Sequence, residues 1–547
     1  MRAHLLPLVV AFSFALTVSP VSKAGDVETR PNVKVTRDNN NVDGLVATPS
    51  FDARNNPQRE TSVAISPVDP NTVVIASNDL RLSDETQFET SGSWIGINVS
   101  IDGGATWFNT MIPGFAHDTS AAGATSPLKR FVIASSSDPT VRFDAAGNLY
   151  VSGLVASVIG PIPKIVEVPD NLTFVSKYNY IPGTRAGVST PNAAANPPNF
   201  MYAFTTIVDS GAISVLPFRA PPKAPGQFDD KPWLGVDKHP ASPCFGNVYM
   251  AFTPFHGVNG TFPTVFSRST DGGVNFSAPV VISQKGQDGS PTGLGTNIAV
   301  GTDGRIYVSY SRFSSTNGDQ QSVSVVRSDD CGRHFSKPVQ AVVSFITMQE
   351  FEPGLTFRTP TLPWVAVDDT NSDVVYVAYT AKQGSPSHGD VFVARSIDGG
   401  TTWGAPVKVN DDATNKHQFF PAITVSNGAL HVAWYDLRDS ANPESPVVTN
   451  GVLGVYYASS NTSSASYPAF SPNVKVSDVG FDPFCTDFIG DYIELAAHFD
   501  GAQHVVHVAW TDLRDIPPDL CHSTDFVPLH TGVLNENIYT GRLVVAP

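Results

Sequence analysis

The sequence has few charged residues, few cysteines and no long apolar run after its first two dozen residues. Charged residues make up 15% of the 547-residue chain, and cysteine occurs only 4 times. Stretches with the 3.6-residue apolar period of an amphipathic helix are absent. Glycine (43) and proline (44) are plentiful, which favours many short strands joined by tight turns. The composition therefore predicts an all-β protein.

The N-terminus has the pattern of an export signal. Arg2 and His4 precede an apolar run over residues 5–18, and Ser22-Lys23-Ala24 fits a cleavage site. The run is short for a membrane span and no later segment reaches one, so no membrane partner is expected. The pattern predicts a signal peptide over 1–24 and a secreted or periplasmic mature domain over 25–547.

The acidic balance limits the class of partner. The formal net charge is −16, and removing Arg2 and Lys23 with the signal peptide takes it to about −18. Nucleic acids and anionic membranes bind broad basic surfaces, so neither is expected as a partner. A small anionic sugar remains compatible, because a few arginines in a pocket can bind a carboxylate.

One short turn sequence occurs four times, over residues 100–107, 269–276, 328–335 and 396–403. The common pattern is Ser-x-Asp-x-Gly-x-x-aromatic. Asp-Gly or Gly-Gly supplies the positive φ angles of a tight hairpin, and the carboxylate can accept backbone N–H groups of its own turn. A structural role is therefore expected for the four aspartates, Asp102, Asp271, Asp330 and Asp398.

These turns resemble the Asp box of the sialidase (BNR-repeat) superfamily. The resemblance implies a β-propeller in which the Asp boxes are structural and lie on the face opposite the active site. Segments 230–233, 488–492 and 510–514 are also similar to a bacterial group of exported, Asp-box, sialidase-like proteins, whose substrates are mostly unassigned. The likeness extends over almost the whole mature chain.

The strands recur in seven similar units of about 75 residues, which is typical of four-stranded propeller blades. Sialidases have six blades, and six is the alternative. Residues 32–36 are expected to pair with the last blade and close the ring, and residues 155–199 are expected to form a loop insertion in blade two. In such a meander the turns between strands A and B and between C and D share one face. Any pocket should therefore lie at the opposite face, where B–C and D–A connections meet.

Three strands are followed by the same tetrad pattern on the expected pocket face, at residues 78–81, 435–438 and 511–514. One interpretation makes their aspartates catalytic and their arginines substrate-binding. The alternative is that Asp and Arg bridge adjacent blades. The residues concerned are Asp79, Asp436 and Asp512 with Arg81, Arg438 and Arg514.

The segment before the last blade contains a second set of candidates. Tyr492 and Glu494 are two residues apart, hence on one side of a strand, and resemblance to sialidases would make them the nucleophile and its base. A plain strand role is the alternative. Asp491 and Arg59 are candidate substrate ligands. However, the Arg-Ile-Pro motif of active sialidases is missing, since Arg59-Glu60-Thr61 stands in its place. Glu60, residues 229–231 and Arg358 also lie in D–A connections.

No phosphate-binding loop, His-Glu-x-x-His or Gly-x-Ser-x-Gly motif is present. No cofactor or metal is expected, although Asp411-Asp412 or Asp487 with Asp491 are an alternative calcium site. The leading hypothesis is a monomeric, secreted glycoside hydrolase of the exo-sialidase type. The alternatives are a non-catalytic propeller that binds glycan or protein and a polysaccharide lyase.

The four cysteines allow three pairings, and the topology favours one. Cys244 and Cys331 are expected on the face of the repeated turns, whereas Cys485 and Cys521 are expected on the pocket face. A pair across faces would span a strand length of roughly 17–20 Å, but a disulfide needs Cα atoms within about 7 Å. The pairs Cys244–Cys331 and Cys485–Cys521 are therefore predicted.

Overall fold

The structure is a computed structural model. It describes residues 27–36, 57–80, 93–115, 118–130, 134–157, 171–187, 193–211, 227–256, 261–283, 293–313, 320–348, 352, 355–383, 388–441, 451–461, 469–486, 488–516 and 536–547.

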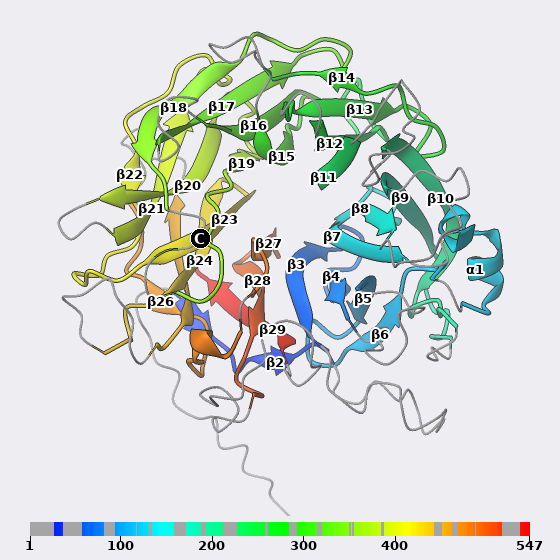
Figure 1. Ribbon diagram of the computed structural model, residues 1–547, viewed down its shortest axis with the longest axis horizontal. Coiled ribbons are helices and arrows are strands. Elements are labelled where there is room, and N and C mark those ends of the chain that lie inside the picture. Colours follow the sequence, from blue (N-terminus) through cyan, green and yellow to red (C-terminus); the bar gives the residue numbers. More distant parts are fainter. Residues whose placement is uncertain are drawn as a thin grey trace, which may run out of the picture.

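Seven antiparallel sheets stand around a common axis as the blades of a β-propeller (Figure 1). Blade one contains β3 (Gln58–Ile65), β4 (Val73–Asp79), β5 (Trp94–Ser100) and β6 (Phe108–Met111). Blade two contains β7 (Ala134–Phe143), β8 (Leu149–Ser157), β9 (Asn171–Tyr180) and β10 (Phe200–Gly211). Blade three contains β11 (Gln227–Val236), β12 (Val248–His256), β13 (Val265–Ser269) and β14 (Val280–Val281).

Blade four contains β15 (Leu294–Val300), β16 (Ile306–Phe313), β17 (Gln320–Ser328) and β18 (Val339–Ile346). Blade five contains β19 (Trp364–Val367), β20 (Val375–Gln383), β21 (His388–Ser396) and β22 (Val407–Lys408). Blade six contains β23 (Gln418–Ser426), β24 (Ala429–Asp436), β25 (Gly454–Asn461) and β26 (Val474–Lys475). Blade seven contains β27 (Glu494–Phe499), β28 (His504–Asp512), β29 (Asn537–Val545), β1 (Val27–Thr29) and β2 (Val33–Lys34).

The ring is closed by strands from both ends of the sequence. In blade seven, β1 pairs with β29 from Val27 opposite Val545, and β2 pairs with the same strand at Val33 opposite Thr540. The expected closure by residues 32–36 and the count of seven blades, against the alternative of six, are both confirmed.

Helix is scarce in the described part of the chain. It consists of α1 (Ala121–Thr125) and two 3₁₀ turns, Pro127–Arg130 and Pro483–Cys485. None of the described helices is long and apolar enough to cross a membrane. Strands rich in β-branched and aromatic residues fill the core instead, with Trp94, Trp434 and Trp510 fully buried between the sheets.

Each of the four repeated turns joins the third and fourth strands of its blade, in blades one, three, four and five. In the first copy, Ser100 Oγ donates to Asp102 at 2.7 Å and accepts from the Gly104 amide at 2.8 Å. Asp102 also accepts from the Thr106 amide at 2.9 Å. The other three copies repeat these contacts. All four turns therefore lie on one face, because each ends a strand that runs in the same direction.

The expectation that residues 155–199 form a loop insertion is wrong for part of that range. β8 continues to Ser157, and Asn171–Tyr180 form β9, which pairs with β8 and β10 as the third strand of the blade. Apolar or aromatic residues at every second position except Ser176, namely Leu172, Phe174, Tyr178 and Tyr180, were the signal of this strand within Pro- and Asn-rich sequence.

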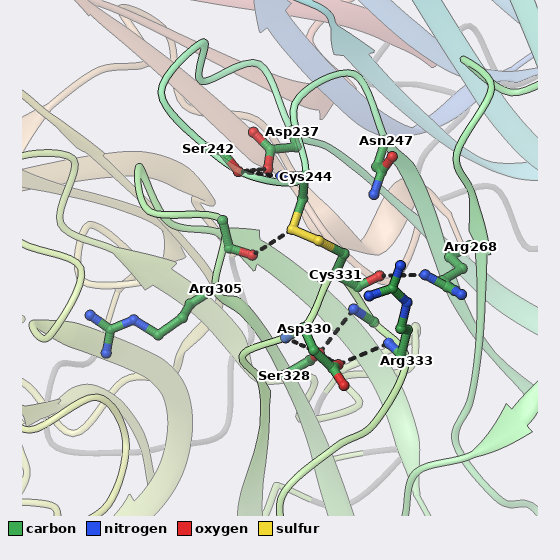
Figure 2. Close-up of a disulfide and its surroundings, with 12 residues drawn as sticks. Asp237, Ser242, Cys244, Asn247, Arg268, Arg305, Ser328, Asp330, Cys331 and Arg333 are labelled. Carbon is green, nitrogen blue, oxygen red and sulfur yellow. Dashed lines mark hydrogen bonds between the residues drawn. A yellow bond between two sulfur atoms is a disulfide. The ribbon is translucent and has the colours of Figure 1, made fainter.

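A disulfide links neighbouring blades on the face of the repeated turns (Figure 2). Cys244, in the A–B turn of blade three, bonds to Cys331 in the repeated turn of blade four, with the Cα atoms 5.4 Å apart. This predicted pair is confirmed. Cys485 is buried, but Cys521 lies outside the described residues, so the second pair stays a prediction.

Candidate functional site

The inner strands of five blades carry a bulge near the end that faces the expected pocket. The pairing with the second strand shifts there, and one residue in each bulge has a positive φ. These residues are Glu60, Asp138, Lys231, Gly295 and Phe420. A bulge re-aims side chains relative to the regular pleat, and here it brings charged groups from blades one, two and three together at the axis.

Lys231 is the centre of this group of charges. Its Nζ lies 3.2 Å from Glu60 Oε1, 3.2 Å from Asp138 Oδ1 and 2.6 Å from Asp491 Oδ2. Only 10% of the Lys231 side chain is exposed, so these ion pairs are protected from solvent. We call Glu60, Asp138, Asp230, Lys231 and Asp491 the axial cluster.

The carboxyl groups of the axial cluster differ in their proton affinity. Burial raises the pKa of Glu60 well above its usual value, and the negative charges of Asp138 and Asp491 add to the rise against the opposing charge of Lys231. Although burial opposes it, the charge of Lys231 and the hydrogen bonds that Lys231 donates from its amide and its Nζ hold the pKa of Asp138 below its usual value. Burial and the neighbouring Asp138 charge raise the pKa of the half-buried Asp230 to about 7. The cluster therefore contains both proton donors and acceptors near neutral pH.

Tyr492 lies against the axial cluster. Its side chain is buried, with the hydroxyl 3.5 Å from the Pro139 carbonyl oxygen and the ring centroid 5.5 Å from Lys231 Nζ. Burial first, and then the negative charge of Glu60 and Asp138, raise the pKa of Tyr492. The phenol is therefore neutral, and it would need a carboxylate to accept its proton before it could attack a substrate.

Glu494 has other partners than Tyr492. Its carboxylate accepts from Ser62 Oγ at 2.5 Å and from the Val63 amide at 3.0 Å, and it pairs with Arg142 at 2.9 Å. These contacts join blade seven to blades one and two. Within the described part of the chain, no hydrogen bond links Glu494 to Tyr492, so the paired role inferred from their spacing has no supporting contact.

Arg59 and Arg358 stack over the ring of Phe488 beside the axial cluster. Each of them is also bound to a carboxylate. Arg59 donates to both oxygens of Glu536, at 2.5 and 3.0 Å, and Arg358 donates to both oxygens of Asp491, at 2.7 and 2.5 Å. Their guanidinium carbons lie 5.4 and 4.9 Å from the centroid of the Phe488 ring. Asp491 therefore binds cations of the protein, and Arg358, with 36% of its side chain exposed, is the more accessible arginine.

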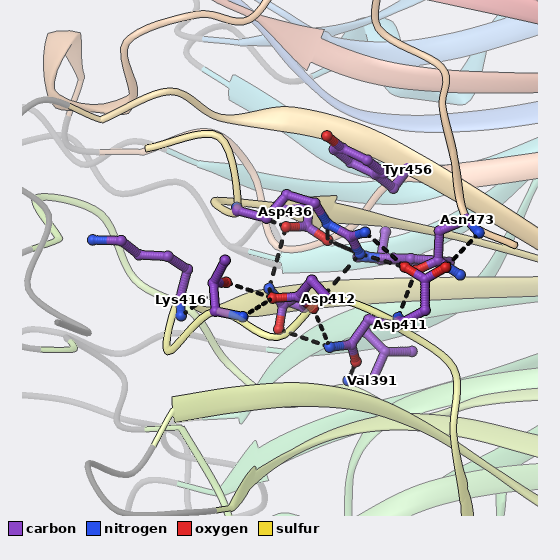
Figure 3. A network of polar contacts seen from close by, with 12 residues as sticks. Val391, Asp411, Asp412, Lys416, Asp436, Tyr456 and Asn473 are labelled. Atoms are coloured by element: carbon purple, nitrogen blue, oxygen red, sulfur yellow. Dashed lines mark hydrogen bonds and ion pairs between the residues drawn. The ribbon is translucent and has the colours of Figure 1, made fainter. Parts of the chain in front are cut away.

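The tetrad of blade six forms a clamp to the preceding connection (Figure 3). Trp434 Nε1 donates to Asp436 at 2.9 Å, and Arg438 pairs with the same carboxylate at 2.8 Å. Arg438 also pairs with Asp411, in the connection from blade five, at 2.9 Å.

Blade seven repeats this arrangement. Trp510 donates to Asp512 at 2.7 Å, and Arg514 pairs with Asp512 at 2.8 Å and with Asp478, in the connection from blade six, at 2.6 Å. The two tetrads thus bridge adjacent blades, as the structural interpretation proposed. In blade one Asp79 is buried at the end of β4, and Arg81 lies outside the described residues.

The alternative calcium site has no support from its aspartates. Asp411 is bound by Arg438, and Asp412 accepts from Asn410 Nδ2 at 2.8 Å and from Thr414, while Asp487 lies outside the described residues. No group of three or more acidic, histidine or cysteine side chains suited to a metal ion occurs in the part of the chain that the structure describes.

Asp138 was missed by the sequence analysis, although a signal was present. Proline directly follows the bulge residue in Asp138-Pro139, Lys231-Pro232 and Phe420-Pro421. Proline in an inner strand of a sheet indicates a bulge, because it cannot donate to the ladder. Aligning these prolines would have placed Asp138 at the same level as Lys231.

Comparisons with known proteins give no family. No family model matches the chain, and no curated protein matches it. Among solved structures, it is similar to a protein of unknown function from Dyadobacter fermentans at 13% identity and a TM-score of 0.41, covering 95% of this chain and 99% of the other. A GH93 α-L-arabinofuranosidase of Fusarium graminearum matches at 12% identity and a TM-score of 0.42, covering 94% and 98%.

A Trypanosoma rangeli sialidase matches at 10% identity and a TM-score of 0.41, covering 79% of this chain and 60% of the other. Likeness at this level of identity and TM-score assigns neither a family nor an activity to this chain. The functional argument therefore rests on the site.

Proposed function

We propose that this chain is an exported, glycan-acting propeller and that the axial cluster is the centre of a glycoside hydrolase site. The observation that carries the proposal is the convergence of carboxyl groups from several blades beside a tyrosine, with the pKa of Asp230 at about 7. Glycosidases need one carboxyl group that gives a proton and another group that attacks or activates water.

The roles follow from the proton affinities in the cluster. Asp230, half protonated near neutral pH, would donate its proton to the leaving glycosidic oxygen and later take one from water. Tyr492 would attack the anomeric carbon, displacing the leaving group that Asp230 protonates, while ionised Asp138 accepts the phenol proton. Water, deprotonated by Asp230, would then displace the Tyr492 oxygen from the anomeric carbon, and Asp138 would return the proton to it. Arg358 is the exposed cation that would contact a polar or anionic group of the sugar.

The proposed substrate class is broader than the sialosides that an exo-sialidase hydrolyses. Sialidase resemblance calls for three arginines on one carboxylate, and among the described residues Arg59 and Arg358 are each bound to a carboxylate of the protein. A neutral sugar therefore suits the site as well as an anionic one.

The test is turnover of a panel of 4-methylumbelliferyl glycosides that includes a sialoside and an α-L-arabinofuranoside. We expect one member to be hydrolysed, with D230N and Y492F each lowering kcat at least 100-fold, on the order of a lost acid/base or nucleophile. The matched control D329N changes an exposed aspartate in a turn and should leave kcat unchanged. Normal turnover by D230N and Y492F would show that the chemistry lies elsewhere.

A second candidate is a non-catalytic propeller that binds glycan or protein. The burial of Tyr492 and the neutralisation of Lys231, Arg59 and Arg358 by carboxylates favour it. It predicts an inactive panel together with glycan binding that R358A weakens.

The proposed export predicts that the secreted protein has its mature N-terminus at Gly25. The proposed monomer predicts a particle mass of one chain in light scattering.

A further inference from the structure

A small space lies beside the axial cluster, between the inner regions of blades three, four and five. Its volume is about 20 Å³, and Asp138, Lys231 and Tyr492 are among the residues that line it. We call this space the axial pocket. Its apolar walls are Pro232, Trp233, Leu362, Pro363 and Trp364.

The accessible surface inside the axial pocket is mainly apolar. Trp233 lies edge-on to Trp364 with ring centroids 4.7 Å apart, and edge-on to Tyr492 at 5.7 Å. In the described structure Trp233 Nε1 has no hydrogen-bond partner, but the atom also has almost no accessible surface. The indole therefore presents carbon atoms to the pocket and offers it no donor.

Polar side chains around the axial pocket are bound within the protein. Thr296 Oγ1 donates to the Lys231 carbonyl at 3.0 Å, and Asn297 Oδ1 accepts from the Val365 amide at 3.0 Å. Asp138 and Lys231 are paired with each other in the axial cluster. A polar group that entered the pocket would lose its contacts with water and regain few of them, so the pocket favours an apolar group.

The size of the axial pocket limits the group that it can take. One ordered water molecule needs a cavity of roughly 10–15 Å³. The 20 Å³ of the axial pocket therefore holds a group about as large as methyl. An acetamido group is too large to enter whole.

Leu362 forms the mouth of the axial pocket, because it is the one lining residue that is not buried. It lies against Gly295, where an added Cβ would come within 2.6 Å of Leu362 Cδ2. Gly295 occupies the bulge position that carries Lys231 in blade three and Phe420 in blade six. The missing side chain in blade four leaves room for Leu362, whose size then sets the width of the pocket.

We propose that the axial pocket takes the methyl group of a 6-deoxy sugar, so that the substrate of this site is a 6-deoxyhexoside. The inference rests on the glycoside hydrolase proposed above. The methyl group of such a sugar is attached to the ring carbon next to the ring oxygen, and this oxygen is bonded to the anomeric carbon. A methyl group in the pocket therefore keeps the anomeric carbon near Tyr492, which lines the same pocket.

An ordinary hexose differs only by the hydroxyl of its hydroxymethyl group. That hydroxyl would have to enter the apolar space together with its carbon. An apolar pocket discriminates against an added hydroxyl by up to about 100-fold in kcat/KM. The expected preference for the 6-deoxy sugar is therefore measurable.

The test compares 4-methylumbelliferyl glycosides in pairs that differ only at this hydroxyl. The pairs are β-D-fucoside with β-D-galactoside, α-L-fucoside with α-L-galactoside, and α-L-rhamnoside with α-L-mannoside. We expect the 6-deoxy member of one pair to have a kcat/KM at least tenfold above that of its partner.

Two substitutions at the mouth connect this preference to the axial pocket. L362A should admit the hydroxymethyl group and reduce the ratio of the two kcat/KM values at least fivefold, and L362V should reduce it by a smaller factor. V343A, at an exposed valine of β18, is the matched control and should keep the ratio of the parent. Melting curves of L362A and L362V check that both variants are folded.

The outcomes separate this inference from the proposed hydrolase. Equal hydrolysis of both members of a pair, or turnover of other glycosides but of no 6-deoxyhexoside, would overturn the inference and leave the hydrolase standing. A preference that L362A and L362V leave unchanged would also overturn it, because the methyl group would then bind elsewhere. Turnover of no glycoside at all would overturn both proposals.

Discussion

Lys231 Nζ lies 2.6 Å from Asp491 Oδ2, and this contact joins the inner regions of blades three and seven across the propeller axis. The same ammonium reaches blades one and two through Glu60 and Asp138. Blades that do not adjoin in the ring are thus connected through one cation. Such a buried pair adds little net stability over an apolar contact, but removing one partner leaves the others uncompensated.

Replacing Lys231 by methionine should therefore lower the free energy of unfolding by about 3–5 kcal/mol at pH 7.5. The loss should shrink as the pH falls towards 4, because the carboxylates that remain take up protons. Guanidinium unfolding at several pH values measures both effects. A loss below about 1 kcal/mol at every pH would mean that the cluster does not depend on its cation.

The raised pKa of Asp230 should make the free energy of unfolding depend on pH. Its pKa in the folded chain is about 7, raised from 3.8. The folded state therefore holds the proton more tightly, so this group stabilises the fold below about pH 4, and the contribution is lost as the pH rises through 7. D230N should remove this loss and make the protein more stable at pH 8 by about 1–3 kcal/mol. Unfolding curves of D230N that keep the parent pH profile would contradict the assignment.

The two clamps should respond alike to the same substitution. R438A and R514A each leave a buried carboxylate, Asp436 or Asp512, without its cation. We expect each to destabilise the fold by about 2–4 kcal/mol. R333A, at an exposed arginine, should change stability by less than about 0.5 kcal/mol. Thermal and denaturant unfolding measure this, and a loss for only one of the two arginines would show that the clamps are not equivalent.

The disulfides can be checked chemically. Non-reducing peptide maps should show Cys244 linked to Cys331 and, as predicted, Cys485 linked to Cys521. Replacing Cys244 and Cys331 by alanine opens a loop with a sequence separation of 87, which should lower the free energy of unfolding by about 2–5 kcal/mol. Treating the parent with reductant should remove this difference. A Cys331–Cys485 peptide would contradict the assignment of faces.

The fold could be predicted because its signals are local and repeated. A turn pattern that occurs four times and strands of regular spacing identify the blades, and chain direction then places Cys244 and Cys331 on the same face. One strand, β9, was hidden because its flanking sequence is rich in proline and asparagine.

The candidate site was predicted only in part, because contacts across the ring have no local signal. The sequence placed Glu60, Lys231 and Asp491 on the pocket face, but not the bulges that make them meet. Motif repetition also pointed to Asp436 and Asp512 as catalytic candidates. The repeated motif instead has a structural role, because Arg438 and Arg514 each pair with an aspartate in the connection from the preceding blade.

The bulges of the inner strands have a structural consequence. The same backbone geometry presents Glu60, Asp138 and Lys231 in three blades and the uncharged Phe420 in another, with no change in blade topology. The bulge thus accepts side chains of different charge in different blades, but the charged ones in blades one, two and three also connect those blades at the axis. A change of charge at Lys231 would therefore alter both the chemistry at the axis and the cohesion of the ring.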